Sequence, residues 1–255
     1  MTMDPNGVRK SELKEDFILA RGYWSPLWDG LLDLDPGYFE AYLRFSEVPW
    51  RRGTLDAKVK EMVYIAVDAV TTHLFEPGIR IHVRNALGHG ASLLEIVEVI
   101  ELCTLIGLEA SSFGLPILLE EMVAAGLAED RHTAPLDAEC AALKEELTKT
   151  LGYWPAGWEA GLRLDADYFG TVVRLTKAPF ELSALDPRTA QLIMIAANAS
   201  VTHANPEAAR AHIRSALALG VTPEQIVEVL QLASVLGVHS ATISIPIAID
   251  EANNQ

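Results

Sequence analysis

The feature that most constrains this chain is an internal repeat at a fixed offset of 130 residues. Residues 22–121 align with residues 152–251 without a gap, so that His82 of the first copy corresponds to His212 of the second. A match of this length and register indicates the duplication of one unit of roughly 130 residues, a period too long for a solenoid repeat. The chain is therefore expected to form two whole domains, or two halves related by a pseudo-twofold axis.

The apolar residues of each copy recur at helical spacing. Between residues 59 and 70 they occupy positions i, i+3 and i+4, which is typical of a buried helix. Gly90 is expected to end the following helix in the left-handed conformation, and Ser92 with Glu95 forms a capping-box pattern for the next helix. Pro49 is expected to end an earlier helix, because the residue before a proline avoids helical geometry. Since no extended strand-like alternation occurs, the predicted fold is all-α.

A polar and broken segment separates the two copies. Its composition predicts a linker at residues 127–136, between a first unit at 1–126 and a second unit at 137–255. Each unit has the size of an ordinary domain. Half of the residues are hydrophobic, which is enough for a sizeable core and argues against disorder.

Charge and cysteine content narrow the class of protein. The formal net charge of −15 argues against binding to nucleic acid, because phosphates would be repelled. Cys103 and Cys140 are far apart and follow no pattern, which favours a reducing compartment without a disulfide framework. The N-terminal segment lacks the apolar centre of a signal peptide, and no uncharged apolar run has the length of a membrane span. We expect a cytoplasmic protein with no membrane or nucleic-acid partner.

Each copy carries the same histidine motif in the same helical setting. In the first copy, Lys58 and Glu61 open a helix, a polar break follows, and the sequence HVRNALGHGAS at 82–92 leads into a helix that begins EIVEV at Glu95. The second copy repeats the motif at 212–222. This arrangement resembles the carboxymuconolactone decarboxylase and AhpD-like superfamily over the central part of each unit.

The resemblance implies an all-α fold of two tandem AhpD-like units and one of two chemistries. One branch of the superfamily reduces peroxides with a Cys-x-x-Cys pair just before the histidine, and the other decarboxylates a lactone without cysteine. Residues 73–78 and 203–208, where the pair would lie, contain no cysteine. Because a peroxidatic site needs a thiolate and a resolving thiol, peroxidase activity is not expected.

The resemblance also implies assembly into homo-oligomers. If single-unit relatives form rings of six units, a fused pair needs only three chains to complete the same ring. The expected assembly is therefore a homotrimer, with a dimer as the second possibility.

His82 and His212 occupy the position of the superfamily's functional histidine. The resemblance implies that at least one of them exchanges a proton with a carbon next to a carbonyl, and imidazole suits this role because its pKa lies near neutral pH. The structural alternative is a buried histidine that is hydrogen-bonded to a helix terminus.

Glu61 is a candidate catalytic acid of the first copy, but Gln191 replaces it in the second copy, and His239 likewise replaces Glu109. If the acid is essential, only the first unit is competent by itself, unless sites form at the junction of the units and share one glutamate. The structural alternative is that Glu61 is an exposed partner of a lysine three residues earlier on the same helix.

His73 and His203 stand where the resemblance places the first cysteine of the peroxidase branch. Paired with the motif histidines they would be able to bind a carboxylate, and His73, His82 and Glu61 would together supply three metal ligands. The structural alternative is a histidine stabilised by the dipole at a helix C-terminus. Because the spacing matches no known metal signature, we predict no metal. No organic cofactor is expected either, since the sequence has no glycine-rich phosphate loop.

Arg80 and Arg210 flank the motif histidines and are candidates for a two-pronged contact with a substrate carboxylate. The alternative is an ion pair with the glutamate that both copies carry in the following helix. Tyr23 and Trp24 are candidates for a ligand wall, with packing in the core or at an interface as the alternative.

These residues predict a lyase of the carboxymuconolactone decarboxylase type, or a related isomerase, acting on a small carboxylated, ring-derived metabolite. Decarboxylation leaves an enolate that must be stabilised and protonated, which a histidine acid and an anion site can accomplish. The alternative function is a non-catalytic protein of the same fold that binds a small molecule or serves in assembly.

Overall fold

The computed structural model describes residues 5–127 and 135–254, and every regular element within them is a helix. The first unit consists of α1 (Pro5–Arg21), η1 (Pro26–Trp28), α2 (Asp29–Leu34), α3 (Pro36–Arg52), α4 (Ala57–Ala69), α5 (Glu76–Gly88), α6 (Leu93–Thr104), η2 (Leu105–Leu108) and α7 (Glu109–Ala124). The second unit consists of α8 (Ala138–Leu151), α9 (Trp158–Leu164), α10 (Ala166–Leu182), α11 (Pro187–Ala199), α12 (Pro206–Ala218), α13 (Pro223–Ser234), η3 (Val235–Val238) and α14 (His239–Asn253). The predicted all-α fold with two tandem units is confirmed; most of the predicted linker, residues 128–134, lies outside the described residues.

Local sequence signals fix several helix ends as predicted. Ser92 and Glu95 form a capping box at the start of α6, and Thr222 and Gln225 form the equivalent box at the start of α13. In each case the N-cap hydroxyl and the later side chain satisfy two backbone N–H groups that the helix leaves without partners. Gly90 ends the preceding turn with a φ of +85°, a conformation that favours glycine.

The predicted helix end at Pro49 is wrong, because α3 continues through it to Arg52. Tertiary contacts hold the last turn of α3 in place. Pro49 is buried, and its carbonyl accepts a hydrogen bond of 2.8 Å from the Lys60 ammonium of α4. The next residue, Trp50, stacks on Tyr64 with 6.5 Å between ring centroids.

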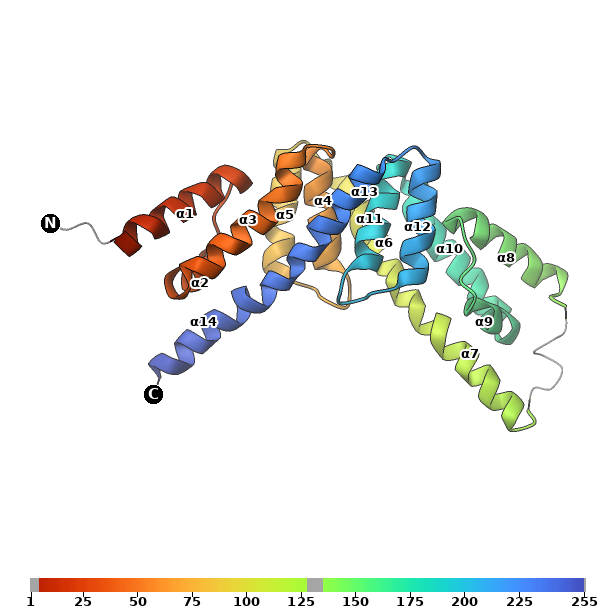
Figure 1. Cartoon of the computed structure of the whole chain (residues 1–255). Helices are drawn as coiled ribbons and strands as arrows, with labels where there is room; N and C mark the ends of the chain where they lie inside the picture. Colours follow the sequence, from red (N-terminus) through yellow and green to blue (C-terminus); the bar gives the residue numbers. More distant parts are fainter. Residues whose placement is uncertain (1–4, 128–134, 255) are drawn as a thin grey trace.

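The two units share one hydrophobic core. The buried faces of α4 and α6 from the first unit meet those of α11 and α13 from the second in a single cluster. These helices occupy the middle of the molecule, while the N-terminal helices of each unit lie at opposite ends (Figure 1). The strongly apolar sequence of α4 and α11 follows from this position, since almost every side chain on them is enclosed.

Two buried glutamates join the units. Glu98 of α6 accepts hydrogen bonds from the backbone N–H groups of Ala184 and Leu185, at 2.7 and 2.9 Å. Glu228 of α13 accepts one from the backbone N–H of Thr54 at 3.1 Å, and also lies 2.8 Å from the Lys60 ammonium. These carboxylates therefore bind the opposite unit and are not partners of the arginines beside the motif histidines, as the structural alternative had assumed.

The last helix of each unit crosses to the other unit. Helix α14 packs on η1 and α2 of the first unit, and α7 packs on α9 of the second. The approach is close enough to require glycine: a Cβ on Gly30 would lie 2.9 Å from Ile249, and one on Gly157 would clash with the backbone of Ser112. Figure 1 shows α14 running beneath the N-terminal helices and α7 beneath α8–α10. The start of each crossing helix, at His239 and Glu109, is thereby placed among residues of the opposite unit.

Two continuous helical stretches, Leu93–Ala124 and Pro223–Asn253, are long and apolar enough to cross a membrane by length and composition alone. Their first parts, α6 and α13, contribute to the shared core. Core helices of soluble proteins satisfy the same criterion, so these two stretches are weak evidence for a membrane span.

Candidate active site at the junction of the two units

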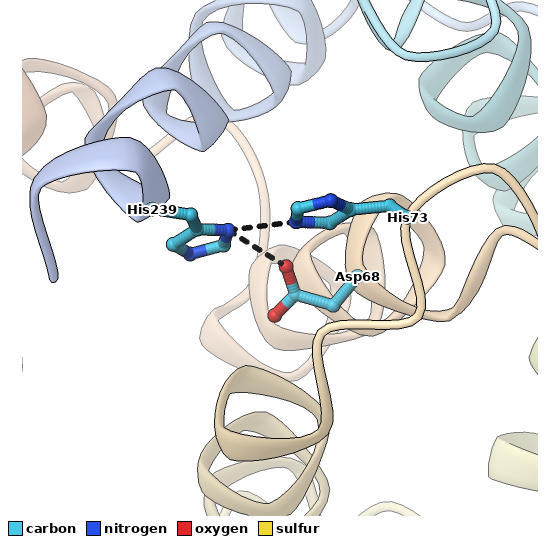
Figure 2. A group of neighbouring side chains, drawn as sticks. All are labelled: Asp68, His73 and His239. Atoms are coloured by element: carbon cyan, nitrogen blue, oxygen red, sulfur yellow. Dashed lines mark hydrogen bonds and ion pairs between the residues drawn. The ribbon is translucent and has the colours of Figure 1, made fainter. Parts of the chain in front are cut away.

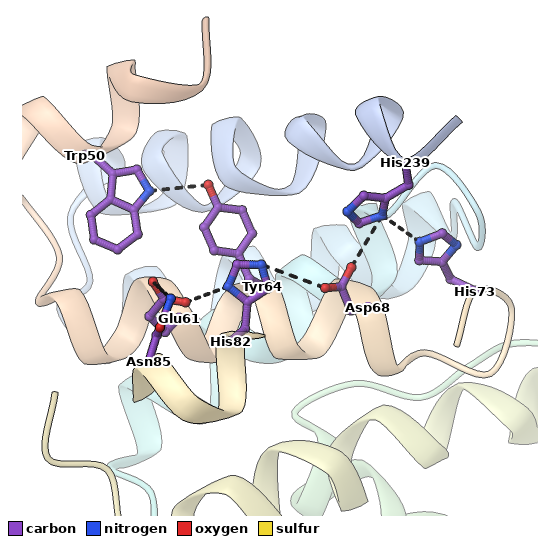
Figure 3. A network of polar contacts seen from close by, with 8 residues as sticks. All are labelled: Trp50, Glu61, Tyr64, Asp68, His73, His82, Asn85 and His239. Carbon is purple, nitrogen blue, oxygen red and sulfur yellow. Dashed lines mark hydrogen bonds and ion pairs between the residues drawn. The ribbon is translucent and has the colours of Figure 1, made fainter. Parts of the chain in front are cut away.

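The motif histidine of the first unit forms a buried pair with an acid. His82 on α5 faces Glu61 on α4, and its Nδ1 lies 2.6 Å from Glu61 Oε2 (Figure 3). The amide of Asn85 donates a hydrogen bond of 3.3 Å to the other oxygen of Glu61. With the carboxylate accepting from Nδ1–H, the second ring nitrogen, Nε2, is left for proton transfer. Glu61 is therefore not an exposed partner of Lys58, which pairs with Glu95 instead, at 2.7 Å.

The His82 ring is held between aromatic side chains. Tyr64 stacks on it with centroids 4.5 Å apart, and Tyr23 meets it edge-on at 6.4 Å. On the Nε2 side lies the carboxylate of Asp68, with 3.9 Å between Nε2 and Oδ2. This packing fixes the orientation of the imidazole.

His82 borders a small cavity that both units enclose. The first unit contributes Arg21, Tyr23 and Trp28 with parts of α3, α4 and α5, and the second contributes the corner between η3 and α14, including His239. The volume is about 30 Å³, which holds one or two water molecules. The site is therefore a composite of the two units, one of the arrangements left open by the sequence.

Arg21 is a residue of this site that sequence reasoning missed. It is buried, its guanidinium lies 5.0 Å from the ring centroids of both Trp50 and Tyr64, and its Nε and Nη1 have no hydrogen-bond partner within residues 5–127 and 135–254. A buried guanidinium with free donors beside a cavity is suited to bind an anion. The repeat contained a signal for Arg21: the equivalent residue of the second copy is the apolar Leu151, so the charge is present in the first copy alone.

A second polar group adjoins the cavity. His73 Nε2 lies 2.9 Å from His239 Nδ1, which is 3.6 Å from Asp68 Oδ1 (Figure 2). Burial, followed by the charge of Glu61, raises the pKa of Asp68 to about 8. Burial, followed by His73 and His82, lowers the pKa of His239 to about 3. His73 thus contacts a residue of the second unit, and does not pair with His82 as the sequence analysis had considered.

The equivalent site around the second motif histidine has an amide in place of each acid that surrounds His82. His212 Nδ1 lies 2.9 Å from the amide oxygen of Gln191, and its Nε2 has no hydrogen-bond partner in the part of the chain that the structure describes. Asn198 stands in place of Asp68, and Glu109 in place of His239. Burial lowers the pKa of His212 to about 4. His203 does not line this cavity of about 20 Å³, in which Glu109 and Tyr153 are the ionisable residues that accompany His212.

The remaining predicted contacts lie elsewhere. Arg80 is exposed and pairs with Glu76 at 2.6 Å, Arg210 is exposed, and neither lines a described cavity at a motif histidine. Trp24 packs against Phe17 in the core, and its indole donates a hydrogen bond of 3.0 Å to an aspartate. Of the four predicted substrate-binding residues, Tyr23 is the one that lines the cavity.

The two thiols are separate and enclosed. Cys103 and Cys140 are both buried, and each donates a hydrogen bond to a backbone carbonyl 3.6 Å away. Burial raises the pKa of Cys103 to about 12, so the reactive thiolate form is suppressed at neutral pH. The chain therefore lacks the chemistry of a dithiol peroxidase site.

The fold and the site together define an all-α protein made of two fused units, with a buried histidine–glutamate pair at their junction. The sequence profile of the carboxymuconolactone decarboxylase family matches residues 36–114 and 166–242, and the chain belongs to this family. It is similar to the crystal structure of a candidate gamma-carboxymuconolactone decarboxylase subunit from Burkholderia xenovorans LB400. The two share 37% sequence identity and a TM-score of 0.90, over 96% of this chain and 98% of that chain. No significant match was found among curated proteins.

Proposed function

We propose that this protein is a carbon–carbon lyase of the carboxymuconolactone decarboxylase type, which acts on a small carboxylated metabolite in the first site. The observation that carries the proposal is the buried pair of His82 and Glu61, 2.6 Å apart, beside a cavity that also contains the free donors of Arg21. Family membership and the similarity to a candidate decarboxylase subunit support it.

In the proposed reaction Arg21 binds a carboxylate of the substrate and so orients the ring against His82. The carbon–carbon bond to the departing carboxylate breaks, carbon dioxide leaves, and the electron pair forms an enolate. His82, as imidazolium, then donates its Nε2 proton to the carbon, and a proton from solvent replaces it. Glu61 stabilises the imidazolium and fixes the tautomer of the neutral imidazole that remains after proton transfer.

The hydroxyl of Tyr23 is a suitable donor to the enolate oxygen. Its pKa is raised to about 12 by burial, against the opposing effect of Arg21, so it remains protonated at neutral pH. Typical small-molecule sites measure roughly 300–1,000 Å³, whereas this cavity measures about 30 Å³. The proposal therefore requires that the aromatic wall moves aside to admit the substrate.

The test is an assay of carbon dioxide release and absorbance on a panel of carboxylated lactones and β-keto acids, with wild type, His82→Gln and His212→Gln. We expect gas release that is lost in His82→Gln and retained in His212→Gln. A spectral change without gas would favour isomerisation or hydrolysis. A loss confined to His212→Gln would contradict the assignment of the first site, and inactivity on the whole panel would favour the non-catalytic alternative.

A further inference from the structure

We infer that Asp68, His73 and His239 bind a divalent transition-metal ion. One ligand atom from each of the three lies within 4.8 Å of the others. The residues come from three places in the fold: the C-terminal part of α4, the turn after it, and the first residue of α14 from the second unit. Figure 2 shows the two imidazoles and the carboxylate pointing toward one another.

The first argument is the unsatisfied carboxylate. Asp68 is 1% exposed, and neither of its oxygens has a hydrogen-bond partner among the described residues. Buried carboxylates in folded proteins are normally paired, hydrogen-bonded or bound to a metal. The hydrogen bond between His73 and His239 satisfies one nitrogen on each ring and leaves the Asp68 carboxylate without a donor. A cation at the point where the three groups converge would satisfy it.

The second argument is the spacing of the ligand atoms. The nitrogens of His73 and His239 are 2.9 Å apart, and His239 Nδ1 is 3.6 Å from Asp68 Oδ1. Two ligands at the usual bond lengths of about 2.0–2.1 Å in a tetrahedral site are separated by about 3.3 Å. The observed distances lie on either side of that value, so a small rotation of the rings would complete the geometry.

The donor set indicates the kind of metal. Two imidazole nitrogens and one carboxylate oxygen suit Zn²⁺, Fe²⁺, Co²⁺ or Ni²⁺, whereas Mg²⁺ and Ca²⁺ prefer oxygen ligands. Three protein ligands leave at least one coordination position for water or an anionic ligand. That position would be close to His82, whose Nε2 is 3.9 Å from Asp68 Oδ2. The inference concerns metal binding itself and does not depend on the proposed function.

The repeat supplies its own comparison. Asn198, His203 and Glu109 occupy the equivalent positions of the second unit, where a neutral amide stands in place of the Asp68 carboxylate and a carboxylate in place of the His239 imidazole. One ion per chain is therefore expected. The ligand set considered from the sequence, His73 with His82 and Glu61, differs from this one, because Glu61 is hydrogen-bonded to His82.

The experiment uses the full chain without a histidine tag, freed of metal by a chelator and then titrated with Zn²⁺ and Co²⁺. Calorimetry and elemental analysis give the affinity and stoichiometry, and the visible spectrum of Co²⁺ reports nitrogen and oxygen ligation. The variants are Asp68→Asn and His73→Asn, with His203→Asn as the matched control. Asp68→Asn copies the residue that the second unit tolerates at the equivalent buried position, so it is expected to fold.

We expect one ion per chain for wild type and for His203→Asn. Loss of one ligand should weaken binding by at least about 100-fold, since even groups that only support a ligand contribute 10–100-fold. Absence of binding to wild type would overturn the inference. Equal binding by wild type, Asp68→Asn and His73→Asn would also overturn it, because the ion would then be bound elsewhere. Circular dichroism of each variant separates loss of a ligand from loss of the fold.

Discussion

Thr72 and Thr202 occupy equivalent positions 130 residues apart, and their hydroxyl oxygens lie 3.3 Å from each other. Because each residue meets its own counterpart, the pseudo-twofold axis passes between them. The axis relates two cavities with nearly the same backbone but different chemistry. One is lined by His82, which is hydrogen-bonded to the carboxylate of Glu61, and the other by His212, which is hydrogen-bonded to the amide of Gln191.

The first prediction uses that difference. In the second site the position equivalent to Glu61 is Gln191, so Glu61→Gln makes the two sites alike at this position. The substitution removes the negative charge that stabilises a protonated His82. Turnover should fall by about 100-fold or more, the usual range for disabling a general acid–base group. Steady-state rates on the substrate found by the gas assay provide the measurement.

Gln191→Glu is the matched control for this substitution. It restores the acid in the second site, but Leu151 still stands where the first site has Arg21, so turnover should stay at the wild-type value. Full activity of Glu61→Gln would show that the carboxylate is not needed by His82.

The second prediction tests which of two arginines, Arg21 or Arg80, contacts the substrate carboxylate. Arg21→Gln should raise KM for carboxylated substrates by about 10- to 100-fold, since hydrogen bonds to charged groups contribute about 1.5–3 kcal/mol. Arg80→Gln should leave KM unchanged, because Arg80 is exposed and bonded to Glu76. A raised KM in Arg80→Gln with an unchanged KM in Arg21→Gln would indicate that Arg80, and not Arg21, contacts the substrate carboxylate.

The repeat and the helical periodicity were sufficient to predict the fold class, and the motif was sufficient to single out His82 and Glu61 as candidate site residues, although not their direct contact. Arg21, Asp68 and His239 were not recognised as parts of the same site. His239 lies 157 residues after His82, and their meeting depends on α14 crossing to the first unit. Hydrophobic periodicity reports which face of a helix is buried, and does not report which unit covers that face. Tertiary contacts, which hydrophobic periodicity does not report, likewise explain why α3 continues through Pro49.

The third prediction concerns a close approach beneath the site. A Cβ on Gly78 would clash with the carboxylate of Asp68 and lie 2.7 Å from the Phe75 ring. Gly78→Ala should therefore lower the free energy of unfolding by about 1–3 kcal/mol through overpacking. Gly88, on the same helix, has nothing within 4 Å of an added Cβ, and Gly88→Ala should raise stability by up to about 1 kcal/mol. Urea denaturation of both variants tests the contrast, and equal effects would contradict it.

The fourth prediction is a pH dependence of stability from His212. Burial lowers its pKa from 6.5 to about 4, so between these values the unfolded chain binds more protons than the folded one. The free energy of unfolding should consequently fall as the pH drops from 6.5 toward 4, by roughly 3 kcal/mol from this residue. Urea titrations across that range should show a shallower dependence for His212→Gln. An unchanged slope would mean that His212 does not take part.

The fifth prediction is self-association. Helices α7 and α14 expose large apolar side chains, among them Phe113 at 67%, Ile117 at 55% and Ile247 at 57%. Exposed apolar surface of this kind marks interaction sites, and we propose a homo-oligomer, with a trimer expected ahead of a dimer. Sedimentation equilibrium measures the mass, and Ile117→Glu or Ile247→Glu should reduce it. A wild-type monomer would refute the proposal.

The fusion of the two units into one chain also has a consequence for how the two sites can change over generations. In a pair of identical separate units, one substitution in the gene would alter both sites at once. In the fused chain each site is encoded by its own codons, so a substitution in one copy leaves the other copy unchanged. Glu61 and Gln191, at equivalent positions of the two copies, are an example. Inheritance can therefore conserve one cavity while the other drifts, and the shared core keeps the drifting half folded as a support for the first.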